Sequence, residues 1–297
     1  MNNENLNPFS ENYDAMGDDN LLIDKILKGN KSALDDLILR HQAWIYNIAV
    51  RMILDPVEAE DITQEILIKI ITKLSTYDSS KSAFRTWLYR IVANHVLNLK
   101  MSSKENTITE MTSKNGYKNM LNEIKDTGLL SSPERYSALI ESRTYCFSGI
   151  LICLDPRQRL VFILGALFNV SDKIGSEILL MSRDNFRKIL SRSREKIYNF
   201  FNQRCSLLDE NNTCTCSHHA DYLKNLGIIK EEDDQEKTLT YKSIGDLVED
   251  RLNDMEDYYS DFIDLYRDQP MINPPDLTLW LKSVINTDEF KEVFLLH

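Results

Sequence analysis

Apolar residues recur three and four positions apart along most of this 297-residue chain, which is the spacing of one face of an α-helix. The sequence has only nine glycines, few of them clustered, so it offers few of the tight turns that join β-strands. We therefore expect an all-α protein.

The first helical stretch follows a polar N-terminus. Apolar positions between Leu21 and Met52 predict an amphipathic helix pair that is broken near Gly29-Asn30. Asp55-Pro56-Val57-Glu58 predicts the start of the next helix, with Asp55 as N-cap, Pro56 in the first turn and Glu58 completing a capping box. A polar loop over residues 76–82 leads into a helix with Phe84, Trp87 and Leu88, whose spacing places Trp87 in the core.

The apolar pattern fades from about residue 101 and returns at Tyr136, which predicts two small helical domains on a flexible linker. A third, acidic segment with helical apolar positions follows them. The predicted limits are a disordered N-terminal tail at 1–18, a first domain at 19–103, a linker at 104–135, a second domain at 136–204 and a C-terminal extension at 205–297.

The net charge of −11 is unevenly distributed. Residues 1–204 carry 27 Lys and Arg against 25 Asp and Glu, whereas residues 205–297 carry 8 against 21. The acidity therefore belongs to the extension, and basic faces are available elsewhere.

Residues 171–197 have the pattern of a helix-turn-helix. Ile174 and Ile178 give a short helix an apolar face, Leu179 to Met181 can form the turn, and Ser182 is a good N-cap for a second helix. The inward stripe of that helix is Phe186, Leu190, Ser193 and Ile197. Its candidate DNA-binding residues are Arg183, Asn185, Arg187, Lys188, Ser191, Arg192 and Arg194. On periodicity alone, a solvated charged helix explains the pattern about equally well, and Leu180 is bulky for a turn.

Aromatic and basic residues alternate between Tyr77 and Arg90. Single-stranded DNA is bound by stacking on aromatic rings and by cationic contacts to its backbone. Phe84, Trp87 and Leu88 have the spacing of core residues. We therefore assign DNA contacts to Tyr77, Lys81, Arg85 and Arg90.

Residues 58–65 form an acidic helix face on which Asp61 and Glu65 lie one turn apart. No histidine, nucleophile or metal ligand accompanies these carboxylates, so a docking patch for a basic partner, or plain solvation, is favoured over catalysis. No glycine-rich phosphate loop, catalytic triad or Cys-His nucleophile arrangement is found in the sequence, so we expect neither enzymatic activity nor a cofactor. The absence of an apolar stretch of membrane-spanning length and of a signal peptide indicates a cytoplasmic protein without membrane insertion.

Two segments resemble a known family. DPVEAEDITQEILIKIITKL followed by FRTWLYRIVANHVLNL resembles region 2 of extracytoplasmic-function (ECF) sigma factors, and LDPRQRLVFILGALFNVSDKIGSEILLMSRDNFRKILSRSREKI resembles their region 4. The resemblance covers about residues 20–204. It implies a region 2 bundle at 19–103, a region 4 helix-turn-helix at 136–204, and a role in directing RNA polymerase to promoters.

The resemblance also assigns contacts. It makes core RNA polymerase, through its β′ coiled coil and β flap, and promoter DNA the expected partners, and it leaves open whether an anti-sigma factor binds. Asp61, Gln64 and Glu65 become contacts to β′. Residues 77–98 become the reader of the minus-ten element, with Ser79, Lys81, Arg85, Arg90 and Asn94 as contacts, and residues 183–194 the reader of the minus-thirty-five element. Ala93 and Ile189 stand where basic residues are common in the family, which predicts weak, salt-sensitive phosphate binding.

The extension contains Cys205, Cys214, Cys216, His218 and His219, which could supply four ligands to zinc. Their spacing is not a common zinc-finger pattern, and reduced side chains in a turn are the simpler interpretation. The opposite charge signs suggest that the acidic extension folds onto the basic faces of region 2 or region 4, or offers a surface to a regulator; a plain solvated appendage is the alternative.

Two other functions fit parts of the sequence. A stand-alone helix-turn-helix regulator of duplex DNA would need only residues 171–197, and it leaves the loop and helix suited to unpaired DNA without a role. A protein-interaction module would rely on the acidic extension.

Overall fold

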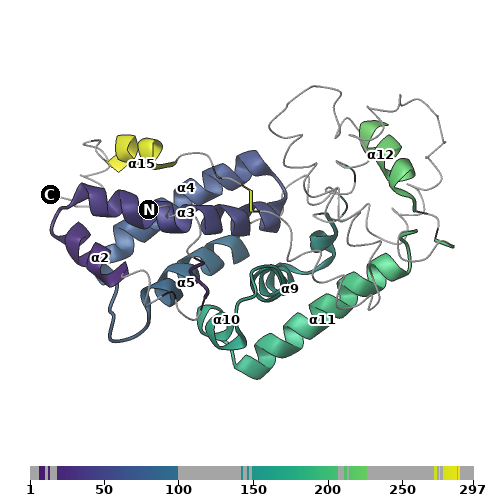
Figure 1. Cartoon of the computed structure of the whole chain (residues 1–297), viewed down its shortest axis with the longest axis horizontal. Coiled ribbons are helices and arrows are strands. Elements are labelled where there is room, and N and C mark those ends of the chain that lie inside the picture. Colours follow the sequence, from purple (N-terminus) through teal and green to yellow (C-terminus); the bar gives the residue numbers. More distant parts are fainter. Residues whose placement is uncertain are drawn as a thin grey trace. The chain divides into compact units, whose positions relative to one another are not determined.

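The computed structural model describes residues 7–10, 13, 19–99, 142, 146, 149–206, 211–212, 214–225, 271–272, 274, 277–285 and 287. The regular elements in these residues are all helical, as predicted, apart from one isolated β-bridge (Figure 1). The predicted linker and the acidic run at 231–234 lie outside the described residues.

The chain forms two compact units that do not follow the order of the sequence. The first comprises Met1–Lys100, Asn169–Phe186 and Met271–His297, and the second comprises Met101–Phe168 and Arg187–Pro270. The domain limits drawn from the sequence remain predictions.

The first unit is built around α3 (Lys31–Ile53), which packs against α2 (Asp19–Leu27), α4 (Pro56–Lys73) and α5 (Phe84–Leu97) (Figure 1). Its core combines aliphatic and aromatic side chains, and Ile45, Ala49 and Ile66 have no exposed surface. Burial of such side chains contributes about 25 cal/mol per Å² of apolar surface, which stabilises the packing of these helices.

Local sequence signals set the helix ends of this unit. Gly29 adopts a left-handed conformation (φ 86°) after α2, and the side chain of Asn30 accepts a hydrogen bond from the Ala33 backbone at the start of α3. The Asp55 carboxylate accepts bonds from the Val57 and Glu58 backbones before α4. The predicted break at Gly29-Asn30 and the predicted cap at Asp55 are both confirmed.

The N-terminal segment differs from the prediction of a disordered tail at 1–18. Phe9 and Tyr13 are 3% and 1% exposed, and the Phe9 ring contacts those of Trp44 and Tyr89 at centroid distances of 5.5 and 4.5 Å. Burial of two aromatic side chains outweighs the polar composition that suggested disorder. The correction applies to residues 7–10 and to Tyr13, since the others before Asp19 lie outside the described part.

The C-terminal extension contributes α15 (Leu277–Ile285) to the first unit, where it packs on α3 and α4 (Figure 1). Leu277 and Leu281 are each 1% exposed. The Asn47 side chain forms two hydrogen bonds with the Ile272 backbone. Ile272 and α15 of the extension thus contact the rest of the first unit through apolar and amide groups, while the acidic run that suggested charge attraction lies outside the described residues.

In the second unit, α9 (Pro156–Phe162) begins with a capping box between Asp155 and Gln158 and continues into the π-helical turn η3 (Ile163–Leu167). The buried Arg159 donates to the carbonyls of Leu151 and Leu154, which fixes the preceding 3-10 helix η2 (Ile150–Cys153). Helix α11 (Arg183–Asn202) begins in the first unit and continues in the second, and α12 (Cys216–Asn225) follows it.

Candidate nucleic-acid interface

An aromatic cluster anchors the loop between α4 and α5. The Tyr77 ring lies 5.2 Å from that of Phe84 and 5.6 Å from that of Trp87, and the Phe84 and Trp87 rings stack at 5.6 Å. The Tyr77 hydroxyl donates to Asn20 Oδ1 and to the Ser82 carbonyl, both at 3.1 Å. Phe84 is buried, whereas Trp87 and Tyr77 are half-buried, so Trp87 lies at the margin of the core rather than inside it.

The loop itself is ordered by Asp78. Its carboxylate accepts bonds from the Ser80 backbone at 3.0 Å and hydroxyl at 2.7 Å, and it pairs with Lys81 Nζ at 3.0 Å. The Ser80 bonds, followed by the Lys81 bond, lower the pKa of Asp78 to about 2. Ser79 and Lys81 remain exposed at the tip of the loop, where an incoming polyanion can reach them.

Of the other residues predicted to contact DNA here, two bind backbone carbonyls. Arg85 Nη1 donates to Ser10 O at 2.7 Å and to Pro8 O at 3.3 Å, and Arg90 Nε donates to Glu177 O at 2.9 Å. Asn94 is exposed on α5. Both arginine contacts join residues 75 or more positions apart. These contacts could not be predicted from the sequence, because only the fold brings those carbonyls close.

The acidic face of α4 is accessible. Asp61 is exposed, the Glu65 side chain is 64% exposed, and Gln64 is half-buried with its amide donating to Glu60 at 3.4 Å. His95, which the sequence analysis did not include, lies beside this face, 3.5 Å from Glu65 and 2.6 Å from Lys69 Nζ. Burial and the Lys69 charge lower the pKa of His95, although Glu65 opposes them, so the ring is neutral at pH 7. The face thus presents carboxylates suited to a basic partner.

The two helices of the predicted helix-turn-helix meet at Gly175. Helix α10 (Asp172–Ile178) is capped by Ser171 and packs against α5. A Cβ atom on Gly175 would lie 2.4 Å from the Phe186 ring, so only glycine allows this approach. The turn contains Leu180 in a left-handed conformation (φ 51°) with 70% of its surface exposed, and Ser182 Oγ accepts from the Asn185 backbone at 3.2 Å. The predicted turn and N-cap are confirmed.

The outer face of α11 is basic and largely open. Phe186, Ser193 and Ile197 of the predicted inward stripe are buried, and Leu190 is half-buried. Arg194 is half-buried as well. The exposed members of the predicted set are Arg183, Asn185, Arg187, Lys188, Ser191 and Arg192.

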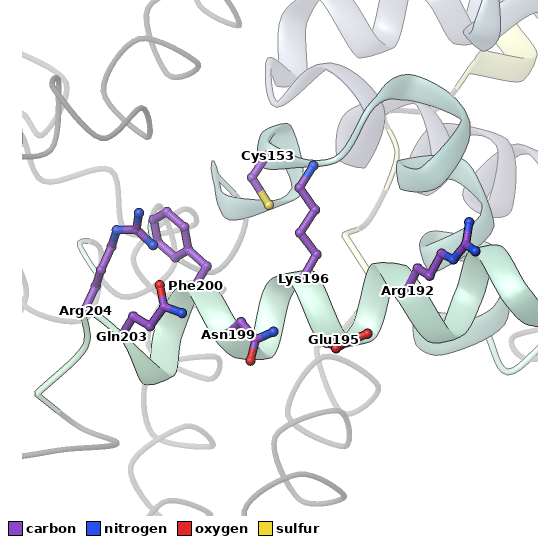
Figure 2. A pocket seen from close by; sticks show the side chains of 8 residues that line it. All are labelled: Cys153, Arg192, Glu195, Lys196, Asn199, Phe200, Gln203 and Arg204. Carbon is purple, nitrogen blue, oxygen red and sulfur yellow. The ribbon is translucent and has the colours of Figure 1, made fainter.

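A hollow of about 450 Å³ lies along the later part of α11, within the second unit. Figure 2 shows the Lys196 side chain extending toward Cys153 of η2. Arg192 and Lys196 share the hollow with Arg204, whose guanidinium lies 4.2 Å from the Phe200 ring centroid. Burial raises the pKa of Cys153, while Lys196, Arg159 and Arg204 lower it in part. Three cations against one carboxylate, Glu195, favour an anionic ligand such as a phosphate. Sequence analysis did not select Lys196 or Arg204, although the i, i+4 spacing of Arg192 and Lys196 was a signal for a shared face.

Metal-holding clusters and membrane-spanning helices are both absent from the described residues. Those residues contain no group of three or more Cys, His, Asp or Glu side chains arranged to hold a metal ion. In the same part of the chain, no helix is both long and apolar enough to cross a membrane.

Comparison with known proteins gives a consistent result for the first unit. The family model that describes Sigma-70 region 2 matches residues 37–105. The RNA polymerase sigma-H factor of Pseudomonas aeruginosa is 40% identical over 80 residues, which cover 27% of this chain and 41% of that protein. The ECF RNA polymerase sigma factor SigW of Bacillus subtilis is 36% identical over 72 residues, covering 24% and 38% of the two chains. The ECF RNA polymerase sigma-E factor of Escherichia coli K12 is 32% identical over 80 residues, covering 27% and 41%. The alignments thus span about two fifths of the length of these curated relatives.

Proposed function

We propose, from the premise that residues 37–105 form a Sigma-70 region 2 domain similar to that of ECF sigma factors, that this chain is a sigma factor. It binds core RNA polymerase and directs promoter recognition, promoter opening and transcription initiation. The observation that carries the proposal is the coincidence of this match with one folded unit that presents both an acidic helix face and an ordered loop beside an aromatic cluster.

The acidic face of α4 is the proposed contact to polymerase. Asp61, Gln64 and Glu65 project from a helix whose opposite side is fixed in the core by Ile62 and Ile66. A rigid helix with exposed carboxylates suits a basic partner surface, because little side-chain and no backbone entropy is lost on binding. By its resemblance to region 2, the partner is the β′ coiled coil.

The loop and the start of α5 are the proposed minus-ten reader. Ser79, Lys81 and Asn94 are accessible for contacts to unpaired DNA, and half-buried Tyr77 and Trp87 offer ring surface on which a base can stack. Arg85 and Arg90 belong to the proposed contact set. To bind DNA, they must release the carbonyls of Ser10 and Glu177 and bind phosphates instead. That exchange is electrostatically favourable, since a phosphate carries a full charge and a carbonyl only a dipole.

The exposed basic face of α11 is the proposed reader of the minus-thirty-five element. The helix begins at Arg183, so Arg183, Asn185 and Arg187 lie in the N-terminal turns that approach base edges in a helix-turn-helix complex. Lys188, Ser191, Arg192 and Arg194 follow toward the phosphates, and we add Lys196 of the α11 hollow to them.

Run-off transcription tests the whole proposal. Purified bacterial core polymerase is combined with the chain on genomic promoter fragments, and transcripts that start at discrete sites only when the chain is present are the expected result. The double variant Asp61→Lys, Glu65→Lys should abolish both core binding and transcripts, whereas Asp36→Lys, which reverses an exposed acid on α3, should retain both. Sequence-specific binding of duplex DNA without any binding of core polymerase would instead identify a stand-alone regulator.

A further inference from the structure

Cys205 and Cys214 follow the end of α11, and Cys216 begins α12, within the second unit. Cys205 and Cys214 are partners in a parallel β-bridge. Two backbone hydrogen bonds form it, from Cys214 N to Arg204 O at 3.3 Å and from Ser206 N to Cys214 O at 3.1 Å. The two cysteines are thus held opposite one another although eight residues separate them.

A side-chain clamp reinforces this bridge. The Asn212 amide donates to Asn202 O at 3.0 Å and to Cys205 O at 3.1 Å, so the residues before Cys214 are tied to the last turn of α11. Adjacent strands lie about 4.8 Å apart, and paired residues project to the same face. At that general strand spacing, the Cα atoms of two paired residues fall within the range of about 4.4–6.8 Å that a disulfide requires.

Cys216 and Cys146 are further thiols of the second unit. Cys216 opens α12, and Ser142 Oγ lies 3.5 Å from Cys216 O and 2.8 Å from His219 Nδ1. Burial raises the pKa of Cys146 well above its usual value, and the charges of Cys214, Cys205 and Cys216 raise it further.

We propose that Cys205 and Cys214 form a redox-active dithiol that a hydroperoxide or a low-molecular-weight disulfide oxidises to an intramolecular disulfide. The five cysteines are reduced in the structure, so a bond between Cys205 and Cys214 would form from two thiols that the β-bridge already pairs. With hydrogen peroxide, one thiolate attacks the O–O bond and becomes a sulfenic acid, and the hydroxide that leaves takes up the proton lost by that thiol to give water. The second thiolate then attacks the sulfenic sulfur, the S–S bond forms, and the hydroxide that leaves takes up the second thiol proton to give a second water. With a small disulfide the same two electrons are transferred by two thiol exchanges, which release two small thiols.

The consequence is mechanical and local to the second unit. An S–S bond across the bridge would add a covalent side-chain link to its two backbone hydrogen bonds and so tie the end of α11 to the segment that leads into α12. This inference does not depend on the proposed promoter function, because it concerns only the chemistry of these thiols.

The test uses the full chain, reduced, desalted and treated with hydrogen peroxide or oxidised glutathione, after which remaining thiols are alkylated. Trypsin cleaves after Arg204 and Lys224, so Cys205, Cys214 and Cys216 fall in one peptide. We expect that peptide to carry a single alkyl group, on Cys216, and to gain the mass of two hydrogen atoms when dithiothreitol reduces its disulfide. The Cys216→Ser variant should behave in the same way, whereas Cys205→Ser and Cys214→Ser should not form the internal bond.

Cys153 provides the matched control, because it is a half-buried thiol of the same unit. Burial raises its pKa and nearby cations lower it in part, whereas the other cysteines are not among the causes of its shift. Cys153→Ser should leave the rate of bond formation unchanged. The inference is overturned if Cys205 pairs with Cys216 or Cys146 in the parent chain, if oxidation yields only bonds between chains, or if the reduced chain holds one equivalent of zinc that protects these thiols.

Discussion

The side-chain amide of Asn47 forms two hydrogen bonds with the backbone of Ile272, 225 residues further along the chain. Asn47 Nδ2 donates to Ile272 O at 2.7 Å, and Ile272 N donates to Asn47 Oδ1 at 2.9 Å. Asn47 has no exposed surface and lies on the central helix α3, so this pair joins the C-terminal extension to the core of the first unit.

We expect Asn47→Ala to lower the free energy of unfolding of the first unit by about 1–3 kcal/mol, because it removes both hydrogen bonds to the half-buried Ile272 backbone. All three tryptophans, Trp44, Trp87 and Trp280, lie in this unit, so tryptophan fluorescence during urea denaturation follows its unfolding. In a chain that lacks residues 271–297, Asn47→Ala should lower the free energy of unfolding by a smaller amount, because Ile272 is already absent. An equal cost in both backgrounds would show that Asn47 acts within α3 alone.

The helix starts and turns of this protein were predictable because short-range chemistry determines them. Asp55 before Pro56, Asn30 after Gly29, and Ser182 at the start of α11 each cap a helix that their neighbours in the sequence already favour. The basic face of α11 followed from helical periodicity for the same reason.

Long-range contacts account for what the sequence could not reveal. The burial of Phe9 depends on Trp44 and Tyr89, and the carbonyl contacts of Arg85 and Arg90 depend on chain segments at least 75 residues away. The docking of α15 was missed because net charge was taken as the guide, whereas Leu277 and Leu281 provide the contact. The pairing of Cys205 with Cys214 also arises only once the chain turns back on itself.

We expect Gly175→Ala to destabilise the helix-turn-helix by about 1–3 kcal/mol, because its new methyl group would overlap the buried Phe186 ring. Binding of duplex DNA that carries the minus-thirty-five element should weaken, while binding to core polymerase through α4 should persist. Both are measured by fluorescence anisotropy. Adding Phe186→Leu should recover part of the lost stability, and the lack of any coupling between the two substitutions would contradict the proposed contact.

We expect Lys81→Ala to weaken promoter opening without lowering stability, since its ion pair with Asp78 is exposed and contributes little. In holoenzyme titrations with single-stranded minus-ten DNA, the plot of log affinity against log salt should become shallower by about 0.7 for the lost phosphate contact. Lys28→Ala removes another exposed lysine of the same unit and should leave the slope unchanged. Equal effects of the two variants would indicate a general charge effect rather than a DNA contact at Lys81.

The acid stability of the first unit should depend on Asp19. Its carboxylate is 5% exposed and binds the Tyr13 hydroxyl at 2.9 Å, His41 Nε2 at 3.3 Å and Arg40 Nη1 at 3.1 Å. Burial alone would raise the pKa of Asp19, but the bond and charge of His41 and the bonds from Tyr13 and Arg40 outweigh it, so the pKa lies below its ordinary value. The Tyr89 hydroxyl lies 3.3 Å from the other ring nitrogen of His41, Nδ1.

Because the folded-state pKa is depressed, the unfolded chain takes up the proton first, so Asp19 stabilises the fold above about pH 4 and this contribution is lost as the pH falls further. We therefore expect Asp19→Asn to lower the free energy of unfolding by about 1–3 kcal/mol at pH 7, and to lower it less at pH 3. Urea denaturation followed by tryptophan fluorescence across this range measures both values. Asp24→Asn, at an exposed position of the same helix, should cost little at either pH. A penalty for Asp19→Asn that stays constant from pH 7 to pH 3 would mean that the packing of the side chain, and not its charge, stabilises this corner of the first unit.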